Sequence, residues 1–183
     1  RFDSIGMFWE DIPVIKEKTG RIERVRAIPS WDEKAWTAPR DFPDLSLAKE
    51  IALDTETYDP HLLTHGPGWG RNDGHMVGIS VAVETGEKWY FPMRHETGDG
   101  NLDPDQVLNW AKENLSGNQP KIGANLIYDA GWLKHEGIAL GGPWYDIQIA
   151  EPLLDENKFS YSLEALAQQY LGTGKVDEEL YRW

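Results

Sequence analysis

A short apolar segment that runs straight into two acidic residues is the feature that most constrains the fold of this chain. Residues 51–57 read IALDTET, so three apolar residues directly precede Asp54 and Glu56. A short apolar run bounded by polar residues is typical of a buried strand. Side chains two positions apart leave the same face of a strand, so the two carboxylates are expected side by side at the end of a core strand.

Two carboxylates placed this close repel each other, and the repulsion raises a pKa unless a cation lies between them. Mg²⁺ prefers carboxylates together with substrate phosphate oxygens as ligands. The Asp-x-Glu pattern therefore indicates either a divalent metal site or an ordinary pair of solvated acids at a strand end. Because the three-letter pattern is common, taken alone it favours the solvated pair.

The segments that follow this strand predict an α/β domain. Residues 76–83 and 88–95 predict two strands joined by a turn, hence an antiparallel hairpin. Helices are expected in four later segments: 103–115, which opens with an Asp-Pro cap signal, 125–136, the segment that begins near Asp146, and 160–172. A hairpin followed by strand–helix alternation predicts a mixed sheet covered by helices.

The helix expected over 125–136 carries a second polar cluster. Asn125 and Asp129 lie four positions apart and share one face of the helix. Asn125 suits the N-cap position and Gly137 suits the end of the helix. An acid in the first turn also interacts favourably with the helix dipole, so Asp129 taken alone is explained by helix stability.

Charge and composition limit the class of partner. The 183 residues carry a formal net charge of −13, which by itself argues against a nucleic-acid partner. Residues 1–49 hold nine basic and nine acidic groups, so the whole surplus lies in residues 50–183. Acids that ligate metal ions would have their charge neutralised where a substrate binds. The absence of cysteine excludes a disulfide scaffold and a thiolate-ligated metal, and no apolar run is long enough to span a membrane.

Taken together and in order, the motifs resemble the 3′→5′ exonuclease domain of family A DNA polymerases, and the bacteriophage-type branch in particular. This domain belongs to the DEDD exonucleases, which are named for four acidic metal ligands. Five residues match its first two motifs: Asp54, Glu56, Asn125, Tyr128 and Asp129. The resemblance is strong over residues 43–172 and weak in the first 28 residues.

The resemblance implies a ribonuclease-H-like α/β fold, a mixed β-sheet flanked by helices on both faces. It also implies hydrolysis of the terminal phosphodiester at a DNA 3′ end with two divalent metal ions, Mg²⁺ or Mn²⁺. Asp54 would bridge both ions, Glu56 would help hold the ion that generates hydroxide, and Asp129 would serve the other ion. As a ligand facing the substrate, Asp129 is expected to be exposed and to contribute little to packing.

Four residues are implied to contact the substrate: Thr55, Thr57, Asn125 and Tyr128, the last by offering a stacking surface. The implied partners are a single-stranded DNA 3′ end and a polymerase domain in the same parent chain, with no membrane partner. The implied location is the cytoplasm, that of a bacterial host if a phage encodes the protein. Two alternatives stay open: a 3′ RNA exonuclease of the same superfamily, and a non-catalytic exonuclease-like scaffold within a polymerase.

The third motif of the family, a Tyr or His followed after three residues by Asp, is missing. Only His95 and Asp99 have this spacing, and they are rejected because they precede the second motif. Tyr181 has the right character, but the chain reaches Trp183 before an Asp occurs. The exonuclease domain, placed at 47–183, is therefore expected to be C-terminally incomplete and impaired by itself.

Three further expectations concern the rest of the chain. Residues 1–46 are expected to be an N-terminal arm that packs on the domain through tryptophans and prolines, with an edge strand near 21–28. The glycine-rich loop over 65–75 is expected to be solvated, and Arg71 is its one basic group within reach of a phosphate. Asp146 is expected to cap a helix, with a smaller chance of lying near the metal ions.

Overall fold

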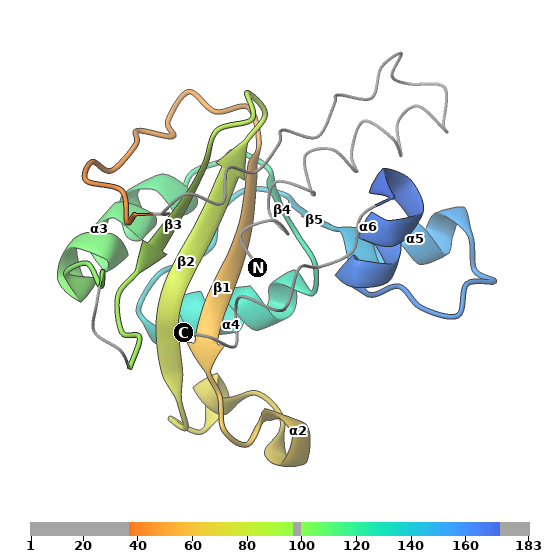
Figure 1. The fold of residues 1–183 in the computed structure, drawn as a ribbon, viewed down its shortest axis with the longest axis horizontal. Coiled ribbons are helices and arrows are strands. Elements are labelled where there is room, and N and C mark those ends of the chain that lie inside the picture. Colours follow the sequence, from red (N-terminus) through yellow and green to blue (C-terminus); the bar gives the residue numbers. More distant parts are fainter. Residues whose placement is uncertain (1–36, 97–99, 173–183) are drawn as a thin grey trace.

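Five strands form one mixed sheet in the order β3-β2-β1-β4-β5 (Figure 1). The computed structural model describes residues 37–96 and 100–172. The strands are β1 (Ile51–Tyr58), β2 (His75–Val83), β3 (Lys88–Pro92), β4 (Lys121–Gly123) and β5 (Trp144–Asp146). β2 pairs antiparallel with β1 and β3, whereas β4 pairs parallel with β1 and β5. The predicted antiparallel hairpin is β2–β3, and it is confirmed.

The four predicted helices are also confirmed. They are α3 (Pro104–Leu115), α4 (Leu126–His135), α5 (Ile147–Leu154) and α6 (Leu163–Leu171). Asp103 caps α3 by accepting from the Gln106 backbone N–H, as the Asp-Pro signal predicts. The glycine-rich region over 65–75 contains the short helix η1 (Gly68–Gly70), and the short helix α2 (Leu62–His65) leads into it.

α4 ends where the sequence predicts it to end. Gly137 has a φ of +80°, a left-handed conformation that glycine adopts without a steric penalty. Its N–H donates to the Lys134 carbonyl, and the Ile138 N–H donates to the Leu133 carbonyl at 2.8 Å. Ile138 and Leu133 are both buried in the core, so this Schellman ending also fixes the chain against the domain.

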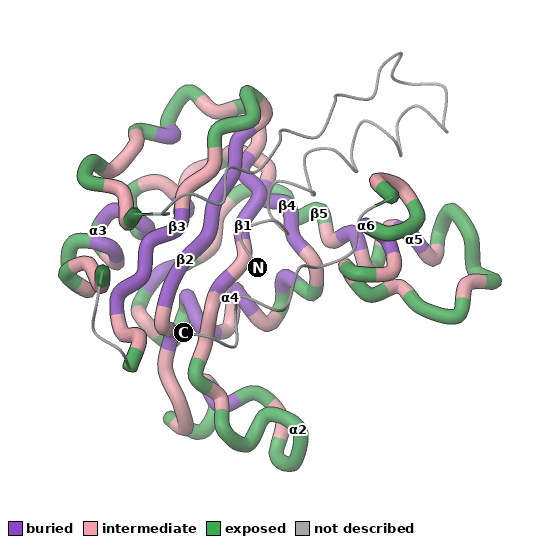
Figure 2. Tube along the Cα trace, viewed as in Figure 1, coloured by how far each residue is buried: buried purple, intermediate pink, exposed green. Residues whose placement is uncertain are grey.

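Helices cover both faces of the sheet, and alternate residues of β1 face the two layers. Leu53 packs in a core with residues of α3 and with Trp132 of α4. Ala52 packs on the other face with Ile147 of α5 and Leu166 of α6. The buried residues run along β1, β2 and β3 in the middle of the molecule (Figure 2). Residues of β1 that follow Leu53 therefore divide between these two layers.

The described end of the N-terminal arm packs on the domain. Phe42 stacks on Phe91 of β3 with a ring separation of 5.3 Å, and the Trp110 indole of α3 donates to the Pro43 carbonyl at 2.7 Å. Leu45 is 3% exposed. The strand expected near 21–28 lies outside the described residues, and the division of the chain at residue 46 stays a prediction.

A buried lysine connects the loops that precede β4 and β5. The Lys121 side chain is fully buried, and its ammonium donates to the carbonyls of Gly117, Gln119 and Gly141 at 2.8–3.1 Å. Three carbonyls satisfy the three donors of an ammonium group. Burial nevertheless lowers the pKa of Lys121 from 10.5 to about 8, because the charged form loses its hydration.

We predict that this lysine makes stability depend on pH in a known direction. Between pH 8 and pH 10.5, the unfolded chain binds a proton at Lys121 that the folded chain has released, so the free energy of unfolding rises with pH. The rise is at most about 1.4 kcal/mol per pH unit and about 3 kcal/mol in total. Urea unfolding of the wild type and of Lys121→Met at several pH values measures it, since the other titrating groups are shared. Parallel pH profiles for the two proteins would contradict the prediction.

Candidate active site

Asp54 and Glu56 lie on the half of β1 that extends beyond β4. β4 pairs only with Ile51 and Ala52, so the following residues of β1 have no strand on that side. The antiparallel register with β2 stays regular through Glu56 and shifts only after it. Both carboxylates therefore leave the face that carries Ala52, the face covered by α5 and α6, and each is half-buried.

Asp129 of α4 takes the place of a strand neighbour next to Thr55. Its Oδ1 atom accepts from both the backbone N–H and the hydroxyl of Thr55, each at 2.7 Å. Asp129 is 3% exposed and Thr55 is 2% exposed. The expectation of an exposed Asp129 that adds little to packing is therefore wrong, because its carboxylate satisfies a buried backbone donor of β1.

The electrostatics of Asp129 depend on Asp54. Burial raises the pKa of the Asp129 carboxyl well above its usual range, and the negative charge of Asp54 raises it further. The two hydrogen bonds from Thr55 act in the opposite direction. The strand acid and the helix acid thus lie close enough to repel each other, although they are 75 positions apart in the sequence.

Asp146 caps the start of α4, although the sequence predicted it at the start of the later helix that begins near residue 146. Asn125 occupies the N-cap position as predicted, but its side chain makes no capping bond, and its φ is +61°. Asp146 provides the cap, because its carboxylate accepts from the backbone N–H groups of Asn125 at 3.1 Å and Leu126 at 2.8 Å. It also accepts from Gln148 at the start of α5. Asp146 therefore fixes the starts of two helices, which confirms the prediction that it caps a helix.

Tyr128 belongs to a hydrogen-bonded chain that joins β1 to the glycine-rich region. Its hydroxyl pairs with the Thr57 hydroxyl at 2.8 Å and donates to Asp59 Oδ2 at 3.1 Å. The same Asp59 oxygen accepts from the Gly68 backbone N–H at 2.9 Å. No local pattern in the sequence predicts this role for Asp59, because its contacts are with residues 9 and 69 positions away.

The glycine-rich region packs on α4 instead of projecting freely. Trp69 lies against Gly131, where a Cβ atom would collide with the indole ring. The Arg71 guanidinium donates to the carbonyls of His65, Gly66 and Pro67 and to Asp73. These bonds use Nη1 and one donor of Nη2 and give Arg71 a structural role in the loop, and the expectation that it reaches a phosphate stays a prediction.

The predicted ligands do not form a closed metal centre. Within residues 37–96 and 100–172, no three His, Asp or Glu side chains converge into a group that could hold a metal ion. Asp54 and Asp129 interact, and Glu56 shares the face of Asp54. The assignments of these three residues as ligands, and of Thr55, Thr57, Asn125 and Tyr128 as substrate contacts, stay predictions.

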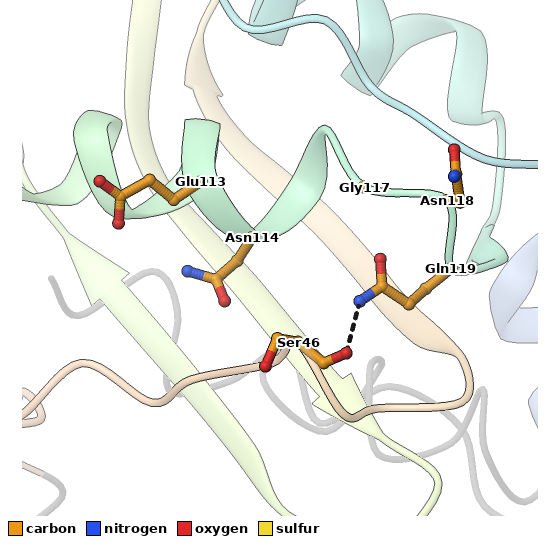
Figure 3. Close-up of a pocket in the computed structure, with 6 residues that line it drawn as sticks. All are labelled: Ser46, Glu113, Asn114, Gly117, Asn118 and Gln119. Atoms are coloured by element: carbon orange, nitrogen blue, oxygen red, sulfur yellow. Dashed lines mark hydrogen bonds between the residues drawn. The ribbon is translucent and has the colours of Figure 1, made fainter.

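Among the described residues, a hollow lies beside the start of β1. A cavity of about 550 Å³ is lined by Ser46, Glu113, Asn114, Gly117, Asn118 and Gln119 (Figure 3). The Ile51 N–H, at the start of β1, bonds to the Pro120 carbonyl beside this cavity. Asp54 and Glu56 lie further along the strand and do not line this hollow, so it is separate from these acids.

Comparison with known proteins shows where the chain has relatives. A 3′-5′ exonuclease family profile matches residues 42–183. The chain is 42% identical over 155 residues to a DNA-directed DNA polymerase of Pseudomonas phage M6. The aligned region covers 80% of this chain and 23% of that protein. It is 32% identical over 137 residues to DNA polymerase I of Pseudomonas aeruginosa, and here the aligned region covers 72% of this chain and 14% of that protein. The chain thus spans less than a quarter of the length of these relatives.

Solved structures share the fold at low sequence identity. Brucella melitensis NrnC with bound Mg²⁺ superposes with a TM-score of 0.53 at 19% identity, over 74% of this chain and 61% of that one. Pol1 from M. smegmatis, in complex with DNA primer-template and dNTP, gives a TM-score of 0.52 at 17% identity, over 70% of this chain and 20% of that one. These likenesses confirm the predicted ribonuclease-H-like sheet with helices on both faces.

Proposed function

The chain belongs to the 3′-5′ exonuclease family of family A DNA polymerases, and on that premise we propose that its acid cluster removes nucleotides from a DNA 3′ end. One observation carries the proposal. Asp54 on β1 and the buried Asp129 on α4 lie close enough for the charge of one to raise the pKa of the other. A structural acid gains nothing from such a neighbour, whereas a site that binds cations does.

The residues present fit divalent metal ions. Asp54, Glu56 and Asp129 offer carboxylate oxygens, the ligand type that Mg²⁺ and Mn²⁺ prefer. Ions bound there would activate a water molecule and stabilise the leaving 3′ oxygen. Thr55 holds the Asp129 carboxylate toward β1 through two hydrogen bonds, and the regular β1–β2 register holds Asp54 and Glu56 on one face. Both arrangements limit the movement of the carboxylates before an ion binds.

We assign the substrate channel to the start of α4 and its neighbours. Tyr128 is half-buried and is anchored by Thr57 and Asp59, so its ring has a fixed direction on which a terminal base can stack. Asn125 leaves its side chain free of the helix cap, which makes its amide available for hydrogen bonds to a nucleotide. Single-stranded DNA in the cytoplasm is the proposed substrate. The names of the relatives support a polymerase domain in the same parent chain.

Two other functions are separated from this one by direct assays. A 3′ RNA exonuclease would degrade an RNA oligonucleotide faster than a DNA oligonucleotide of the same sequence. A non-catalytic scaffold would degrade neither, even in the full-length parent protein with Mn²⁺.

Along the described residues, no helix has both the length and the apolar character needed to cross a bilayer.

We predict that the 183-residue chain by itself is nearly inactive on a single-stranded DNA 3′ end. Asp54, Glu56 and Asp129 lie among the described residues, but no three acidic or histidine side chains there form a group that could hold a metal ion. Small misplacements of reacting groups cost on the order of 10²-fold in rate. A version extended past Trp183 along its parent gene is expected to digest a 5′-labelled oligonucleotide. An Asp separated by three residues from a Tyr or His in the added segment should be essential. Full activity of the 183-residue chain would contradict this and would place another acid in the site.

A further inference from the structure

A row of residues across three strands lies on the same face of the sheet as the acid pair. Asp54 of β1 is directly opposite Ser80 of β2, and Ser80 is directly opposite Tyr90 of β3. Residues paired in this way place their side chains on the same face of a sheet. Tyr90 therefore belongs to the layer that holds Asp54 and Glu56, although it lies two strands away, and it is 5% exposed.

The Tyr90 side chain leans along β2 toward Glu56. Its ring and hydroxyl cover Gly78, where a Cβ atom would collide with the phenol. Gly78 is the residue directly opposite Glu56 on β1. Because side chains of such a pair start about 5 Å apart, we expect a hydroxyl above Gly78 to be within reach of the Glu56 side chain. A glycine at position 78 is what allows this approach.

His95 binds the Tyr90 hydroxyl. The hydroxyl forms a hydrogen bond with His95 Nε2, and the two rings meet edge to face with centroids 5.8 Å apart. Asn101 fixes the backbone of His95 on both sides, since its amide accepts from the His95 N–H at 3.0 Å and donates to the His95 carbonyl at 2.9 Å. Burial lowers the pKa of the His95 imidazole, which favours its neutral form.

We propose that Tyr90, held by His95, is a positioning residue that orients the Glu56 carboxylate, an inference that rests on the proposed function of this site. A neutral imidazole has one N–H group. When Nε2 carries it, that nitrogen donates to the phenol oxygen, and the phenol keeps its own proton for an acceptor on the β1 side. A carboxylate is such an acceptor. His95, which the sequence excluded from the third motif by its position in the chain, thus contributes to the site through Tyr90.

The test uses Tyr90→Phe in the full-length parent protein. It keeps the ring over Gly78 and removes only the hydroxyl. Single-turnover cleavage of a 5′-labelled DNA oligonucleotide is expected to slow by about 10- to 100-fold, the usual effect of losing a partner that orients a metal ligand. The KM for the oligonucleotide should not change. Tyr145→Phe is the matched control, because Tyr145 is 56% exposed on β5, and it should cleave at the wild-type rate.

Two further variants test the direction of the hydrogen bonds. His95→Gln retains an N–H donor near the position of Nε2 and should keep most of the activity, whereas His95→Leu should match Tyr90→Phe. In a Glu56→Gln background, Tyr90→Phe should cause no additional loss of rate. Equal losses in the Gln and Leu variants, or a full additional loss in the Glu56→Gln background, would overturn the proposal.

A stability measurement keeps this inference separate from the proposed function. Urea midpoints of the wild type, Tyr90→Phe, Glu56→Ala and the double variant are expected to be non-additive, because alanine removes the acceptor. Tyr90→Phe loses its bond to His95 in both backgrounds, so it should lower the midpoint less in the Glu56→Ala background than in the wild type. Additive shifts would overturn the contact between Tyr90 and Glu56 even in an active enzyme. If the wild type cleaves neither DNA nor RNA, the proposed function fails, and the urea midpoints alone decide whether Tyr90 and Glu56 are coupled.

Discussion

Asp54→Ala is expected to abolish cleavage of a DNA 3′ end by the full-length parent protein, with a loss of about 10³-fold or more. Removal of a charged ligand takes away several kcal/mol of electrostatic stabilisation of the transition state. Each 1.36 kcal/mol corresponds to a tenfold change in rate. Single-turnover cleavage of a 5′-labelled oligonucleotide in Mg²⁺ measures the loss. The same loss should follow when EDTA removes the metal from the wild type.

Metal binding provides a second measurement that does not depend on turnover. Titration of the chain with Mn²⁺ is expected to show binding by the wild type and none by Asp54→Ala. Asp41→Ala is the control, because Asp41 is an exposed acid on the N-terminal segment, away from β1. Equal Mn²⁺ binding by the wild type and Asp54→Ala would show that the Asp54–Glu56 pair was assigned the wrong chemistry.

The features that the sequence predicted correctly are those set by residues close together in the chain. The apolar run before Asp54 determines β1, the turn between residues 83 and 88 determines the hairpin, and Asp103 and Gly137 mark helix ends at the expected positions. In each case the deciding interactions span a few residues, so a local pattern contains them.

The features that the sequence did not predict depend on contacts between distant residues. Asp146 caps α4 from 20 positions further along the chain, and Asp59 meets Tyr128 across 69 positions. The orientation of Tyr90 depends on Gly78 having no side chain, which a local pattern cannot indicate. The contacts that position these side chains thus come from the packing of elements, whereas the assignment of the acids rests on short motifs and stays a prediction.

The burial of Asp129 changes what its substitution is expected to show. Asp129→Ala and Asp129→Asn should both lose cleavage by about 10³-fold, because neither offers a carboxylate to a metal ion. They should differ in stability. Asparagine keeps an oxygen that accepts both hydrogen bonds from Thr55, whereas alanine leaves the buried Thr55 N–H without its partner, at a cost of about 1–3 kcal/mol.

The sign for the asparagine variant follows from the raised pKa. A carboxyl whose pKa is higher in the folded state than in the unfolded state disfavours folding when it is ionised, so at neutral pH the charge of Asp129 reduces stability. Asp129→Asn removes that charge and keeps the bonds, so its urea midpoint should equal or exceed that of the wild type. Only Asp129→Ala should unfold at lower urea. A stable, inactive asparagine variant would show that the charge of Asp129 is needed for cleavage, because a neutral side chain at this position stabilises the fold at least as well. An asparagine variant that stays active would leave Asp129 as a structural acid and would remove the helix contribution from the proposed site.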